Sequence, residues 1–133
     1  MSRNSYYRLL FVVAAIWNGI AALFSAFALP DPRLRAYLGI AAPADRLSID
    51  LFVLLVVVFG IGYYWVSRDI TANRDLVKLG AIGKLMVFPL FSVHAWLGGI
   101  PWRLTLPALG DLILGLLFVE FLLYTRRRRE HPP

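Results

Sequence analysis

The sequence predicts an all-α fold, an integral membrane four-helix bundle with both termini in the cytoplasm. The chain has 133 residues, and 59% of them are hydrophobic, more than a water-soluble domain of this size normally carries. Four apolar stretches lie near residues 7–29, 49–66, 79–97 and 104–124. A bilayer core about 30 Å thick needs about 20 helical residues, so each stretch is long enough to cross it. We therefore expect residues 1–133 to form a single transmembrane domain.

Helices are expected because lipid offers no partner for exposed backbone N–H and C=O groups, and because no strand-like alternation of polar and apolar residues is present. The orientation follows from the lysines and arginines. Ten of these 14 residues fall on one side of the predicted membrane, namely Arg3, Arg8, Arg68, Arg74, Lys78, Lys84 and Arg126–Arg129. Only Arg33, Arg35, Arg46 and Arg103 fall on the other. Since cytoplasmic loops carry the basic excess, both termini are predicted to be cytoplasmic, in a bacterial inner membrane.

Composition also limits the chemistry that we expect. The chain contains no cysteine, which excludes structural disulfides, thiolate zinc sites and iron–sulfur clusters. The net charge of +6 does not indicate nucleic acid, because the basic residues lie at the edges of apolar runs. We expect no cofactor, no metal and no nucleic-acid partner. The expected partners are the lipid bilayer and either another membrane protein or further copies of this chain.

The first apolar stretch has an alternative interpretation, a cleaved signal peptide, because Ala26-Phe27-Ala28 has the small-x-small form of a cleavage site. Its apolar run is about 20 residues long, which exceeds a typical signal core. The run also contains Asn18 on a face of small residues suited to helix packing. These features favour a retained helix.

The segment of residues 30–48 is predicted to contain a short amphipathic helix on the outer membrane surface. Asp31 is a suitable cap, Pro32 suits the first helical position, and Gly39 suits the end. An irregular polar loop is the alternative. In the second apolar stretch, Gly60 and Gly62 favour close packing, and the aromatic residues at 63–65 are predicted to lie at the membrane interface.

Polar side chains inside the predicted membrane are the candidates for function, because such groups are costly there. The candidate binding residues are Asp111, His94, Lys84 and Asn18, and no catalytic residue is predicted. Matching depths predict an ion pair of Lys84 with Glu120 and a carboxylate–imidazole pair of Asp111 with His94. Each of these residues also has a purely structural interpretation, as a helix-to-helix hydrogen bond or an ion pair.

Periodicity distinguishes the two acids of the fourth stretch. Asp111 and Glu120 are nine residues apart, about 180° around a helix, so they cannot face one pocket together. Asp111 shares its face with Ala108, Gly115 and Phe118, which suits packing against another helix. We therefore predict that Asp111 is the buried polar centre and that Glu120 lies elsewhere.

Two short motifs resemble a known family. Leu79-Gly80-Ala81-Ile82-Gly83-Lys84 and Ala108-Leu109-Gly110-Asp111-Leu112, within four helices in about 130 residues, are similar to the DoxX-like group of small bacterial membrane proteins. This resemblance implies a compact four-helix membrane bundle. It assigns no functional residue, because the group has diverse activities, some of them linked to quinone-dependent sulfur oxidation.

The sequence favours an accessory or structural membrane subunit whose polar residues lock helices together. One alternative is a bundle that handles small molecules or protons in a polar pocket around Asp111. Another is an acid–base membrane enzyme acting on a lipid or a quinone, although no nucleophile–base motif supports it. An enzymatic role is therefore not the favoured prediction.

Overall fold

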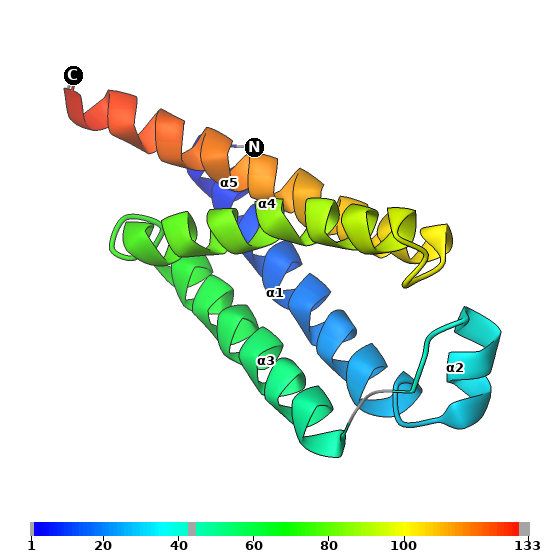
Figure 1. The fold of residues 1–133 in the computed structure, drawn as a ribbon. Helices are drawn as coiled ribbons and strands as arrows, with labels where there is room; N and C mark the ends of the chain where they lie inside the picture. The colour runs from blue at the N-terminus through cyan, green and yellow to red at the C-terminus, as the bar shows by residue number, and fades with distance from the viewer. Residues whose placement is uncertain (1, 43–44, 131–133) are drawn as a thin grey trace.

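The computed structural model describes residues 2–42 and 45–130, with side chains described as far as residue 127. Arg128 and Arg129 thus have their backbone in the last helix, while their side chains lie outside the described part. The described residues form an all-α fold (Figure 1). Its elements are α1 (Arg3–Ala28), α2 (Pro32–Leu38), α3 (Arg46–Arg68), α4 (Arg74–Trp96), the 3-10 helix η1 (Trp102–Leu104) and α5 (Thr105–Glu130). The helices α1, α3, α4 and α5 are long and apolar enough to cross a membrane.

Three of the four long helices begin before the apolar stretches that predict them. At α1 the Ser2 side chain caps the helix by accepting the N–H of Ser5 at 3.2 Å. At α3 the Asp45 side chain accepts the N–H of Ser48 at 2.6 Å. An apolar stretch marks the part that lipid can surround, whereas α1 and α3 begin where a polar side chain satisfies a free N–H group.

The short helix predicted between the first two stretches is confirmed as α2. Asp31 accepts the N–H of Arg33 at 2.8 Å, and Pro32 occupies the first turn. Gly39 ends the helix with φ of 69°, a left-handed conformation that glycine adopts without strain. The Arg103 guanidinium then donates to the carbonyls of Tyr37 at 2.7 Å and Leu38 at 3.3 Å. This contact ties α2 to the segment that leads into α5.

The long helices associate as two pairs. Helix α1 lies along α3, and α4 lies along α5 (Figure 1). The pairs meet near the end of the molecule where α1 and α4 begin and where α3 and α5 finish, which we call the basic end after Arg3, Arg68 and Arg74. Toward the opposite end, which carries α2 and η1 and which we call the α2 end, the two pairs diverge (Figure 1).

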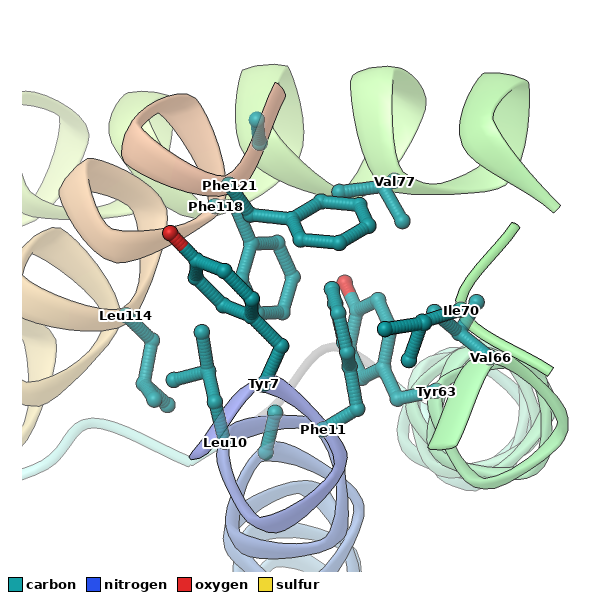
Figure 2. Close-up of a cluster of buried hydrophobic side chains, with 12 residues drawn as sticks. Tyr7, Leu10, Phe11, Tyr63, Val66, Ile70, Val77, Leu114, Phe118 and Phe121 are labelled. Atoms are coloured by element: carbon teal, nitrogen blue, oxygen red, sulfur yellow. The ribbon is translucent and has the colours of Figure 1, made fainter. Parts of the chain in front are cut away.

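The shared hydrophobic core lies toward the basic end and draws on all four long helices (Figure 2). Aromatic rings dominate it. The Phe11 and Phe121 rings meet edge to face at 5.1 Å, and the Tyr63 and Phe118 rings do so at 5.1 Å. Its members are Tyr7, Leu10, Phe11, Ala14, Tyr63, Val66, Ile70, Val77, Ala81, Leu114, Phe118 and Phe121. This cluster joins the two helix pairs at one end.

The aromatic run of α3 contains both exposed and buried residues. Tyr64 and Trp65 are exposed. Tyr63 is buried instead, because its ring packs on Gly80 of α4, where an added Cβ would lie 2.7 Å from the ring. The position of this run at a membrane interface stays a prediction.

Candidate functional site

Lys84 is the centre of a polar cluster inside the fold. It belongs to α4, and only 6% of its side chain is exposed. Its ammonium donates to Oδ1 of Asp111 in α5 at 2.6 Å and to Oδ1 of Asn18 in α1 at 3.0 Å. Burying a charge is costly unless it is paired and hydrogen-bonded, and here both conditions are met. Three of the four predicted binding residues thus meet in one place.

Asn18 extends this cluster to the fourth long helix. Its Nδ2 donates to the backbone carbonyl of Val56 in α3 at 3.1 Å. The approach of α3 is close because Gly60 faces Asn18, and a Cβ added to Gly60 would lie 3.3 Å from the Cβ of Asn18. The Asn18 amide therefore uses its oxygen and its nitrogen on different helices, and the cluster connects α1, α3, α4 and α5.

Aromatic side chains lie on both sides of the ion pair. The Lys84 nitrogen is 5.4 Å from the centre of the Tyr63 ring, within the range of cation–π attraction. The Trp17 indole packs over Gly110, the residue before Asp111, so closely that a Cβ there would collide with it. Neither aromatic was predicted to join the site. The sequence signalled these contacts only through two glycines, Gly80 one helical turn before Lys84 and Gly110 next to Asp111.

Asp111 is the least buried member of the cluster. Its side chain is 21% exposed, and within the described part of the chain its only hydrogen bond is the one from Lys84 to Oδ1. The predicted packing face of its helix is confirmed, since Ala108, Gly115 and Phe118 are all buried. Asp111 therefore belongs to the polar cluster as predicted, but the buried centre is Lys84, and one carboxylate oxygen of Asp111 is still open to a further donor.

The predicted ion pair of Lys84 with Glu120 is wrong. Gly115 faces Leu85 across the α4/α5 pair, and Asp111 is only about 40° from Gly115 around the helix. Glu120 is about 140° away, so its carboxylate turns from α4 toward α1. There its Oε1 accepts the hydroxyl of the buried Tyr7 at 3.0 Å. The positions of the two acids along α5 allowed either one to pair with Lys84. The rotation of α5 about its axis turns Asp111, and not Glu120, toward Lys84.

The predicted pair of Asp111 with His94 is also not formed. His94 lies in the last turn of α4, near the α2 end, and it is exposed. It is ten residues, about 15 Å along the helix, from Lys84, with which Asp111 pairs. Its carbonyl accepts the N–H of Gly99 at 2.9 Å, which is an ordinary helix-ending contact. His94 is therefore not part of the cluster.

The polar cluster contains one positive and one negative charge, and they lie in direct contact. The charges of Lys84 and Asp111 compensate each other, and the Asn18 oxygen satisfies a second ammonium proton. Across residues 2–42 and 45–127, no three His, Asp or Glu side chains gather in the manner of a metal site. The cluster can hold helices together and can accept one further hydrogen bond at Asp111.

The resemblance to DoxX-like proteins stays a prediction. No protein-family model, no curated protein and no solved structure matches this chain.

Proposed function

We propose that this chain is an integral protein of the bacterial inner membrane, with both termini in the cytoplasm and α2 on the outer side. The hydropathy and length of the four long helices support membrane insertion. The charge distribution supports the orientation. Four arginines lie on the side of α2, whereas the other ten lysines and arginines lie on the side of the basic end.

Within that membrane we assign the chain an accessory or structural role, in which the Lys84 cluster locks the two helix pairs together. One observation carries this assignment. The Lys84 ammonium is almost fully buried and is held by Asn18 and Asp111, from both pairs at once. Lipid supplies no hydrophobic drive between helices, so packing and polar contacts of this kind must hold them together.

The test is to purify the wild-type chain in mild detergent and record its mass by native mass spectrometry. An accessory or structural subunit is expected to retain a membrane protein partner or further copies of itself. A double variant, Lys84→Met with Asp111→Leu, is the matched control because it keeps an apolar contact between α4 and α5 without charge. We expect this variant to keep the same partner.

Two results would contradict the assignment. The first is a strictly monomeric wild-type chain with no partner in detergents that preserve membrane complexes. The second is a double variant that folds as well as wild type and yet loses the partner, since the polar groups would then act in recognition and not in holding the helices.

A further inference from the structure

The second carboxylate oxygen of Asp111, Oδ2, has no hydrogen-bond donor among the described residues. A carboxylate can accept about four hydrogen bonds, and this one receives a single donor, at Oδ1, among the described residues. Asp111 lies six residues into α5, about 9 Å beyond its first residue. At that depth in a bilayer there is no bulk water, and an unsatisfied polar group is costly. The exposed part of the side chain therefore favours contact with a donor from outside the chain.

The position of Asp111 in the fold makes such contact reasonable. Ala14 and Leu114 are the members of the shared core nearest to the α2 end in α1 and α5. Asn18 and Asp111 lie one turn beyond them along their helices. The two helix pairs diverge toward that end of the molecule (Figure 1). A Cβ added to Gly19, beside Asn18, would meet nothing within 4 Å. The polar cluster therefore stands at the edge of the packed core and not in its middle.

The charges decide what kind of donor fits. Lys84 already compensates the charge of Asp111, so a cationic ligand would leave an excess positive charge in an apolar surrounding. We propose that Asp111 binds a membrane-soluble molecule through a neutral O–H or N–H group, while the apolar body of that molecule lies toward the α2 end. This inference rests on the membrane placement proposed above and goes beyond the accessory role.

The experiment uses the chain in phosphatidylcholine vesicles and the fluorescence of Trp17, which packs beside Asp111 on Gly110. The exposed tryptophans 65, 96 and 102 are replaced by phenylalanine so that Trp17 alone reports. The probes are an undecanol that carries bromine on a carbon close to its hydroxyl, and the methyl ether of the same molecule, because bromine quenches only nearby indoles and only the alcohol donates a hydrogen bond. We expect saturable quenching by the alcohol, at concentrations about tenfold lower than for the ether.

Asp111→Asn gives the decisive comparison. The amide oxygen can still accept from Lys84, but the second group becomes an NH₂ donor, which either probe can meet with its oxygen. The preference for the alcohol should therefore disappear in Asp111→Asn and persist in Glu120→Gln, the matched control at the other acid of α5. If Asp111→Asn misfolds, the combination of Asp111→Leu with Lys84→Met leaves no unpaired charge and no acceptor at position 111, and it serves for the same comparison.

Equal, non-saturable quenching by both probes would overturn the proposal, because it would report simple partition into lipid. An alcohol preference that survives the Asp111 substitution would overturn it as well. Co-flotation of the protein with the vesicles is recorded separately. A chain that fails to co-float would refute the membrane placement itself, whereas a co-floating chain without alcohol preference would refute only the binding site.

Discussion

The Nζ of Lys84 in α4 lies 2.6 Å from Oδ1 of Asp111 in α5, and the same nitrogen lies 3.0 Å from Oδ1 of Asn18 in α1. A single ammonium thereby connects the two helix pairs. The contact stands one turn beyond the aromatic core, so the pairs are joined by packing near the basic end and by charge at its edge.

Removing the amide of Asn18 should loosen the connection to the α1/α3 pair. Asn18→Leu deprives Lys84 of one acceptor and frees the Val56 carbonyl from its side-chain donor. We expect a loss of about 1–2 kcal/mol in the free energy of unfolding, measured by denaturant titration in detergent. Stability equal to wild type would contradict a stabilising role of the hydrogen bond between Lys84 and Asn18 that connects the two pairs.

The contact of Trp17 with Gly110 provides a test of close helix approach. In Gly110→Ala the new Cβ collides with the indole, so the indole or its helix must shift, at a cost of about 1–3 kcal/mol. Gly83→Ala is the matched control, because its Cβ would meet nothing within 4 Å. That control should be neutral or stabilising by up to about 1 kcal/mol through helix propensity. Equal effects of the two substitutions on thermal stability would argue against this packing.

The hydrogen bond between Tyr7 and Glu120 is expected to contribute less to stability than the Lys84 cluster. Tyr7→Phe keeps the buried ring among its aromatic neighbours and removes only the hydroxyl that donates to Glu120 at 3.0 Å. The expected loss is about 1 kcal/mol of unfolding free energy. Glu120→Gln keeps an acceptor at the same place and should cost less. A larger effect of Glu120→Gln than of Tyr7→Phe would mean that the charge of Glu120 has another partner.

The proposed orientation is testable with single cysteines, because the natural chain contains none. Cysteine in place of Ser2 or Thr71 should resist a membrane-impermeant maleimide in intact cells, since both positions lie at the basic end. Cysteine in place of Ala41, at the α2 end, should react. Labelling is read on gels before and after permeabilisation of the inner membrane. The reverse pattern would place the basic end outside.

Much of this fold was predictable because its signals are local. Apolar runs mark the four long helices, and the residues Asp31, Pro32 and Gly39 mark both ends of α2 by their own backbone and capping preferences. The position of Asp111 on a face of small residues also predicted that it faces another helix. Each of these inferences needs only residues that are near one another in the chain.

The pairing of the polar groups was less predictable because it depends on how whole helices are rotated and tilted. Lys84 lies at a depth that allows either acid of α5, and its long side chain spans the difference to Asp111. Tyr63 follows the same sequence pattern as the exposed Tyr64 and Trp65, but its side chain packs against Gly80 of another helix and is buried. The helical period of each segment does not determine which residues of two different helices face each other.

A double-mutant cycle on Lys84 and Asp111 measures directly whether the ion pair holds α4 to α5 and thereby fixes the ammonium that reaches Asn18 in the other pair. Lys84→Met and Asp111→Leu alone each leave one charge without its partner, at a cost of about 3–5 kcal/mol, whereas both together leave none. We predict that the double variant recovers most of that loss in unfolding free energy. Strictly additive losses would contradict this account, because they would show that the two side chains stabilise the fold independently.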